Sequence, residues 1–367
     1  MIDFRYKNEF VRGIFMNINE ELKKLSNGGK VSLPAGRTDI SEPVILDTPC
    51  TKIEGDVWCC NADPNGVFEC EYGTKLKLAK NDIPAIYVGK ENVLCGIVIK
   101  DIGIQGNIKG MDTRGMFDFK NPRASSGICF DSKRVDQGEV SKVSCCGLGS
   151  GICVTGTAEV DACTFEKINV DGCCIGFYFA PGASFYPIFK NCIAADNPWY
   201  GFFVNGEGIE MHNLDINDFR FVRNGGAFPD EFPYPKAAVC FYKVSDCSVR
   251  NNIFDLAGTF WYYDDDATKN EQRQPSVQPV PALWIEGNRN RITGNTFLNS
   301  SDKSVVVKGD CNILMNNIVD NDILIDGNGN IVSNIVFTSG DAKIIVSKDS
   351  CGTEFMNVPE ERIVYQF

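Results

Sequence analysis

The stretch AADNPWYGFFVNGEGIE, residues 194 to 210, places an acidic residue on each side of an aromatic run. Asp196 precedes the run and Glu207 follows it, at a spacing of 207 − 196 = 11 residues. A carboxylic acid that protonates a leaving oxygen and a carboxylate that assists the incoming hydroxyl together cleave glycosidic bonds. Asp-Asn-Pro and Asn-Gly-Glu are also favourable turn sequences. The two residues are therefore either an acid/base pair or solvated turn residues.

Aromatic and acidic side chains occur together in this run and in two segments that interrupt the pattern around it. Such side chains bind sugars, because rings stack on C–H groups and carboxylates accept hydroxyl hydrogen bonds. A solvated acidic loop with interface aromatics is the alternative interpretation. Calcium binding by the acidic run 264–266 is weakly indicated, because the D-x-[DN]-x-[DN]-G spacing is missing. The candidate substrate-binding residues are Trp199, Tyr200, Phe228, Trp261, Tyr262, Asp264 and Asp265.

A repeat positions these residues. The segments GICF, GICV, GFYF and GFFV begin at Gly127, Gly151, Gly176 and Gly201, at steps of 24, 25 and 25 residues. Short strands at a fixed period, with almost no helical periodicity, are typical of a solenoid. We therefore predict an all-β fold, a right-handed parallel β-helix, with these four strands stacked in one sheet. The Asn- and Gly-rich segments predict sharp turns with stacked Asn amides.

The solenoid is expected to have a covered N-terminal end and three insertions. Asn17 is a candidate N-cap for a helix in the segment 17–26, which would shield the open sheet edge. We expect a cap over residues 1–30, the β-helix over 31–350 and a C-terminal tail over 351–367. The insertions span 105–126, 223–236 and 258–281, and insertions in a solenoid often carry its function.

Composition restricts the partners and the chemistry. The net charge is −12, and no cluster of basic residues interleaved with aromatics occurs, which argues against nucleic acid or a membrane as partner. The 17 cysteines include no C-x-x-C pair and mostly lie beside apolar residues, which predicts reduced, buried thiols and a cytoplasmic location. We see no secretory signal. His212 is the single histidine, so any triad or histidine-containing zinc site would have to use it. No metal site and no cofactor is expected.

From about residue 30 to residue 337, the chain resembles the inulin fructotransferase and difructose-anhydride hydrolase family. The resemblance rests on DNPWYGFFVNGE, on GGKVSLPAGRTDISEPVILDTPCTKIEG, and on the third insertion followed by PALWIEGNRNRITGNTF. It implies a β-helix trimer with active sites between subunits and fructofuranosyl chemistry without metal or organic cofactor. It also implies that Asp196 and Glu207 form the acid/base pair.

The expected compartment separates two activities of that family. Inulin is a polymer, so an enzyme acting on it should be exported, whereas a thiol-rich cytoplasmic chain suits a small imported sugar. We therefore expect hydrolysis of a difructose dianhydride to a linear difructose, with formation of the dianhydride from inulin as the alternative. A pectin- or alginate-type uronan lyase and a non-enzymatic glycan-binding fibre module also remain open.

Overall fold

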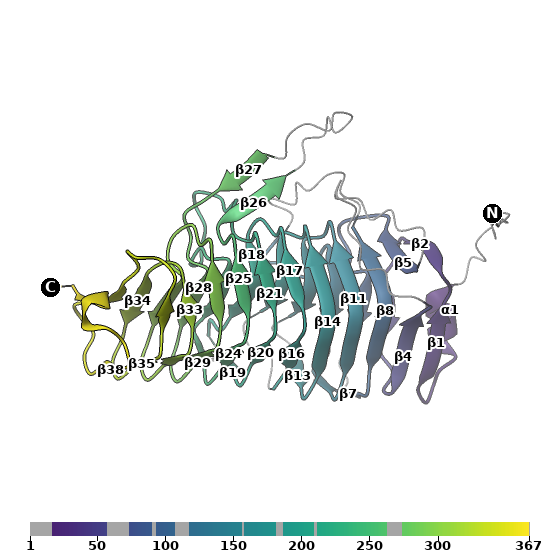
Figure 1. Cartoon of the computed structure of the whole chain (residues 1–367). Helices are drawn as coiled ribbons and strands as arrows, with labels where there is room; N and C mark the ends of the chain where they lie inside the picture. The colour runs from purple at the N-terminus through teal and green to yellow at the C-terminus, as the bar shows by residue number, and fades with distance from the viewer. Residues whose placement is uncertain are drawn as a thin grey trace, which may run out of the picture.

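The fold is described here from a computed structural model. The structure describes residues 17–56, 73–89, 93–106, 117–155, 158–180, 186–208, 211–262 and 274–366. These residues form one elongated stack of short parallel strands, with α1 (Ile18–Lys23) at one end and β38 (Glu354–Met356) at the other (Figure 1). The prediction of a parallel β-helix is confirmed.

One face of the solenoid is a sheet of twelve parallel strands. The four predicted strands are neighbours in it, and Ile128, Ile152, Phe177 and Phe202 pair in one continuous register. The twelve strands are β3 (Val44–Leu46), β6 (Ile86–Val88), β9 (Ser126–Phe130), β12 (Ser150–Val154), β15 (Ile175–Phe179), β18 (Tyr200–Asn205), β22 (Val239–Tyr242), β28 (Leu283–Glu286), β31 (Val305–Lys308), β34 (Ile323–Asp326), β37 (Ile344–Val346) and β39 (Ile363–Tyr365).

The other two faces form a second large sheet, whose strands lie in two parallel rows joined by three long strands. The joining strands are β8 (Val98–Gln105), β11 (Glu139–Cys146) and β14 (Thr164–Asp171). The first row adds β1 (Gly29–Leu33), β4 (Thr51–Gly55), β16 (Ile188–Lys190), β20 (Asp215–Asn217), β24 (Ser248–Arg250), β29 (Arg291–Thr293), β32 (Ile313–Met315), β35 (Ile331–Ser333) and β38 (Glu354–Met356). The second row adds β2 (Gly36–Ile40), β5 (Thr74–Leu78), β17 (Ile193–Ala195), β21 (Arg220–Val222), β25 (Ile253–Asp255), β30 (Thr296–Leu298), β33 (Ile318–Val319) and β36 (Val336–Phe337).

Smaller elements lie at the turns and insertions. The helical elements are α1 (Ile18–Lys23) and the 3-10 turn η1 (Glu360–Arg362). The minor strands are β7 (Val93–Cys95), β10 (Arg134–Asp136), β13 (Glu159–Asp161), β19 (Met211–His212), β23 (Val244–Ser245), β26 (Thr259–Tyr262) and β27 (Gln274–Val277). The last two pair antiparallel as a hairpin that projects from the solenoid (Figure 1).

The N-terminal end of the stack contains the helix expected from the sequence, whereas the C-terminal end contains strands where a tail was expected. Helix α1 begins after Asn17, whose side chain accepts a hydrogen bond from the backbone N–H of Glu20, and its Ile18 and Leu22 are buried. The predicted cap is therefore present in the described part of residues 1–30. At the other end, β38 and β39 pair in parallel with the preceding coil. The coils thus continue through residues expected to be a tail.

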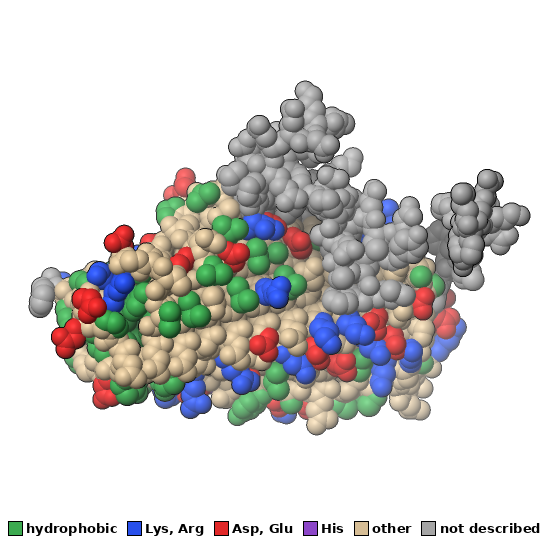
Figure 2. All heavy atoms as spheres, in the orientation of Figure 1, with side chains coloured by type: hydrophobic (Ala, Val, Ile, Leu, Met, Phe, Trp, Pro, Cys, Tyr) green, Lys and Arg blue, Asp and Glu red, His purple; other side chains and the backbone are tan. Residues whose placement is uncertain are grey.

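Stacked asparagines run along the inside of the turns, as the sequence predicted. In one ladder the Asn252, Asn295 and Asn317 side chains are linked by amide hydrogen bonds of 3.0 Å, and all three are buried. Because the stacked amides also satisfy backbone N–H groups of neighbouring coils, the turns contain paired rather than orphaned polar groups. On the face shown in Figure 2, basic and acidic side chains are interspersed.

Candidate active site

Asp196 lies in a turn of the solenoid and is bound to the next coil. It has a left-handed backbone, with φ of 50°, and Arg223 occupies the equivalent position one coil later, with φ of 53°. The Arg223 guanidinium donates from Nε and Nη2 to the two Asp196 oxygens at 2.7 and 2.5 Å. Asp196 is only 6% exposed. A bidentate pair of this kind fixes the turn and occupies both carboxylate oxygens.

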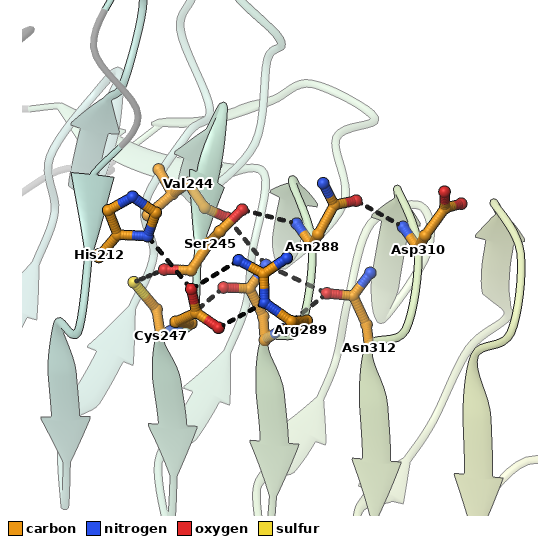
Figure 3. Close-up of polar contacts among 10 residues, drawn as sticks. His212, Val244, Ser245, Cys247, Asn288, Arg289, Asp310 and Asn312 are labelled. Carbon is orange, nitrogen blue, oxygen red and sulfur yellow. Dashed lines mark hydrogen bonds and ion pairs between the residues drawn. The ribbon is translucent and has the colours of Figure 1, made fainter.

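The same device occurs at another turn of the solenoid. Asp246 and Arg289 both have φ of 57°, and the guanidinium of Arg289 contacts the Asp246 oxygens at 2.8 and 2.7 Å. His212 adds an Nδ1 contact of 3.2 Å to Asp246, beside the ladder in which Asn288 donates its N–H to the Ser245 hydroxyl (Figure 3). Because the same aspartate–arginine pair occurs at two turns, Asp196 has a structural role. His212 lies at the surface and has Asp246 as its hydrogen-bond partner.

Asp196 and Glu207 lie at opposite ends of strand β18. The strand contains six residues, Tyr200–Asn205, which span about 17 Å at about 3.3 Å per residue. Glycosidase carboxyl pairs stand about 5 to 9.5 Å apart. Within one chain the two carboxyls therefore lie at opposite ends of the strand, and their pairing in one groove stays a prediction. Most of the residues between Asp196 and Glu207 belong to this extended strand, so the spacing of 11 residues separates the two carboxyls.

Three of the predicted sugar-binding aromatics are packed inside an apolar cluster instead. Trp199, Tyr200 and Phe228 are 5%, 0% and 6% exposed. The rings of Trp199 and Phe119 lie 6.1 Å apart and nearly parallel, and those of Tyr200 and Phe228 meet edge to face at 4.9 Å. The first two insertions supply these covering rings, so the aromatics hold the insertions against the sheet.

The third insertion lies mostly outside the described residues. Trp261 and Tyr262 belong to strand β26, where their backbones pair with Pro275 and Gln274. Asp264 and Asp265 lie outside the described residues. Their proposed roles in substrate binding stay predictions.

Glu207 stands at the edge of an open hollow in the surface. Its side chain is 52% exposed, and its carboxylate lies 3.8 Å from the ammonium group of Lys243. A cavity of about 340 Å³ lies here, lined by Gly206, Gly208, Lys243, Glu286, Gly287 and Asn288. A hollow of this size accommodates a small saccharide.

One carboxylate, Glu286, lines the hollow itself, whereas Glu207 lies between two of its lining residues, Gly206 and Gly208. Glu286 ends strand β28, which lies two strands along the sheet from β18, with β22 between them. Two strand spacings correspond to about 9.6 Å between the chains, within reach of two glutamate side chains. Hydrogen bonding to Tyr242 raises the pKa of Lys243, and the charges of Glu207 and Glu286 raise it further. Lys243 therefore stands between the two acids as a cation.

Tyrosine side chains lie close to Glu207 and Lys243. The rings of Tyr234 and Tyr242 lie 5.6 Å apart, and Lys308 lies over the ring of Trp284 at 4.9 Å. Burial raises the pKa of Tyr234, which also interacts with Glu207. The buried Trp284 Nε1 has no hydrogen-bond partner within the described residues.

Sequence reasoning missed Glu286, although the motif that contains it was recognised. The signal is the strand register: Val204 pairs with Phe241, and Phe241 pairs with Ile285, so the residues following these share one outward row. Asn205, Tyr242 and Glu286 are those residues. The repeat period changes in this region because of the insertions, which concealed the alignment.

The described residues contain neither a metal-ligand cluster nor a membrane-spanning helix. Within them, no group of three or more His, Cys, Asp and Glu side chains is placed to hold a metal ion. No helix in the described ranges is long and apolar enough to cross a membrane.

Comparison with solved structures shows where this fold occurs. The chain is similar to DFA-IIIase from Arthrobacter chlorophenolicus A6 in complex with GF2, with a TM-score of 0.67, 15% identity, and coverage of 95% of this chain and 91% of that one. For a mutant of that enzyme in complex with DFA-III the TM-score is 0.65, with 14% identity and coverage of 95% and 94%. No family model and no curated protein matches the sequence. At this identity the likeness establishes the fold.

Proposed function

We propose that this protein is a carbohydrate-active enzyme that cleaves a fructofuranosyl ketosidic bond in the hollow beside Glu207. The observation that carries the proposal is a cavity lined by Glu286 and Lys243, with Glu207 between two further lining residues, Gly206 and Gly208, and 3.8 Å from Lys243. The likeness over nearly the whole chain to a DFA-IIIase crystallised with GF2 and with DFA-III supports the substrate class.

The two glutamates divide the work of the reaction. One donates a proton to the leaving ketosidic oxygen, and the other, as a carboxylate, assists the attacking hydroxyl or stabilises the positively charged transition state. Lys243 lies 3.8 Å from the Glu207 carboxylate. A difructose dianhydride attacked by water opens to a linear difructose, and this hydrolysis is the direction we favour. Ten buried cysteine thiols support it, because they suit a reducing compartment with small sugars.

A uronan lyase in the same hollow is less well supported. Such an enzyme needs a neutral base to take a proton from the sugar, and Lys243 is the basic residue lining the cavity. Its pKa is raised by hydrogen bonding to Tyr242 and by the nearby carboxylates, so it stays protonated. The acidic groups would also repel a uronate carboxylate.

The proposal is tested by incubating the protein with difructose dianhydride III, inulin and pectin and separating the products by chromatography. Linear difructose from the dianhydride supports hydrolysis, and dianhydride from inulin supports the transfer direction. Unsaturated products from pectin would instead establish the lyase. If no substrate changes, the catalytic proposal fails and the glycan-binding module is favoured.

Two conservative variants locate the chemistry. Glu207→Gln and Glu286→Gln should each lower turnover by at least about a hundredfold, because acid/base assistance contributes 10² to 10⁴. Glu354→Gln is the matched control, since Glu354 is an exposed glutamate on β38, near the other end of the solenoid. Activity that survives both hollow variants would place the reaction elsewhere.

A further inference from the structure

Two exposed cysteines meet at one turn near the N-terminal end of the solenoid. Cys50 lies in the turn before β4, and Cys95 ends β7 in the following coil. The backbone N–H of Cys50 donates to the carbonyl oxygen of Cys95 at 2.7 Å, so the two residues are direct neighbours across the stack. Both side chains are exposed to solvent.

The sulfur atoms face each other. Cys50 hydrogen-bonds through its thiol with Cys95. A Cβ atom at Gly96 would lie 3.6 Å from the Cys50 sulfur, which places that sulfur over the end of β7. Adjacent coils are spaced about 4.8 Å apart, and disulfides join Cα atoms about 4.4 to 6.8 Å apart. The pair therefore meets the distance requirement without a rearrangement of the coils.

We propose that Cys50 and Cys95 form a disulfide that cross-links two coils when a disulfide-class oxidant such as oxidised glutathione is present. One of the two cysteines, as its thiolate, attacks one oxidant sulfur, forms a mixed disulfide and releases one reduced glutathione. The other thiol then loses its proton and attacks the cysteine sulfur of the mixed disulfide, which releases the second glutathione. The two cysteines lose two electrons and two protons, and the oxidant gains them.

The contact between the two side chains also affects the acidity of Cys95. The charge of Cys50 raises the pKa of Cys95, and a hydrogen bond to Cys50 raises it further. The two thiols therefore interact directly, as a disulfide between them requires.

The other described cysteines lack this combination of contact and access. Cys129 and Cys153 pair across neighbouring strands, but both are fully buried, and burial raises the pKa of Cys153. Cys311 and Cys351 are exposed, but the coil containing Gly329 lies between them. Two coil spacings, about 9.6 Å, exceed the reach of a disulfide.

The cross-link would fasten the end of the stack that lies beside helix α1. The Cys50 turn leads into β4, which pairs with both β1 and β8. An end coil of a solenoid has one stacked neighbour instead of two, so it opens more readily than an inner coil. A bond between these turns closes residues 50–95 into a ring and opposes that opening.

The test is oxidation of the full chain with oxidised glutathione, followed by alkylation, proteolysis and mass spectrometry. We expect one cross-linked peptide pair containing Cys50 and Cys95, and a thiol count that falls from 17 to 17 − 2 = 15 under denaturing conditions. The oxidised protein should resist proteolysis at its N-terminal coils, and a reductant should reverse that resistance.

Matched variants separate this pair from general oxidation. Cys50→Ser should abolish the cross-link and the gain in protease resistance, whereas the Cys311→Ser/Cys351→Ser double variant should retain both. The proposal is overturned if Cys50 is found linked to Cys59, Cys60 or Cys70, if the bond joins two chains, or if Cys50 and Cys95 remain alkylated after oxidation.

Discussion

Two carboxylates eleven residues apart have opposite surroundings. Asp196 is buried, and both its oxygens are bound by Arg223, whereas Glu207 is half exposed beside an open cavity. A group that must exchange protons with a substrate needs to be accessible, and Glu207 is accessible whereas Asp196 is not. Residue type and spacing alone therefore overstated the evidence for Asp196 as a catalytic acid.

The pairing of Asp196 makes a stability prediction at a single residue. Asp196→Ala removes the carboxylate that binds the partly buried guanidinium of Arg223, so unfolding free energy should fall by about 3 kcal/mol. Asp246→Ala removes the same bidentate geometry at a more exposed site and should lower it by less than about 1 kcal/mol. Urea unfolding of both variants measures the difference. A hundredfold loss of turnover in Asp196→Asn with unchanged stability would instead restore its assignment as a catalytic acid.

A second prediction at this scale concerns alkaline pH. Burial, followed by the hydrogen bond to Asp131, raises the pKa of Tyr87 to about 12. Because the folded state holds this proton more tightly than the unfolded state, the stabilisation is complete below pH of about 10 and is lost as pH rises to about 12. Tyr87→Phe should remove that step from the pH dependence of the denaturation midpoint. An unchanged alkaline profile in the variant would contradict the assignment.

At the scale of the strand, the repeated glycines explain the motif that revealed the fold. A Cβ on Gly127, Gly151 or Gly176 would lie only 2.5, 2.8 or 2.3 Å from the carbonyl oxygen of the next glycine in the column. The second residue of each strand in this group therefore lacks a side chain, so that the coils can approach. The glycine is a packing requirement rather than a binding motif.

This column gives a direct mutational prediction. Gly176→Ala should lower stability by several kcal/mol or abolish folding, because the backbone of the neighbouring strand cannot move away. Gly340→Ala is the control, since no atom lies within 4 Å of its added Cβ. Thermal unfolding of the two variants should therefore differ strongly, and equal melting temperatures would contradict the explanation.

The strands also show which features of the fold and of the candidate site could be predicted from the sequence. The repeat with steps of 24 and 25 residues was sufficient for the sheet and its register, because each glycine marks the same point of a coil. It could not identify Glu286 as a neighbour of the Glu207 hollow, because the insertions change the length of the coils between them. It also could not show that Trp199 is covered, since the covering ring of Phe119 comes from a distant insertion.

At the scale of the whole molecule, a row of exposed apolar side chains follows the β17–β36 row of strands. Ile193, Ile253, Ile318 and Val336 are 37%, 38%, 36% and 56% exposed and lie along one line of paired positions, which also contains Arg220 and Thr296. Exposed apolar side chains aligned in this way are the kind of surface that chain association covers. Ile253 also lies just before the third insertion, which the resemblance to the fructotransferase family places near a subunit boundary.

We therefore predict that the protein is a homotrimer and that this row contributes to the contact between chains. Light scattering should give three times the mass of one chain. Ile253→Lys combined with Ile318→Lys should dissociate the assembly, because each buried lysine ammonium would be desolvated without a partner. Ile45→Lys, at an equally exposed isoleucine near the N-terminal end, should leave the mass unchanged. If the active sites lie between subunits, turnover should fall with the trimer population as the double variant is diluted. A stable monomer with full activity would contradict the prediction of a homotrimer.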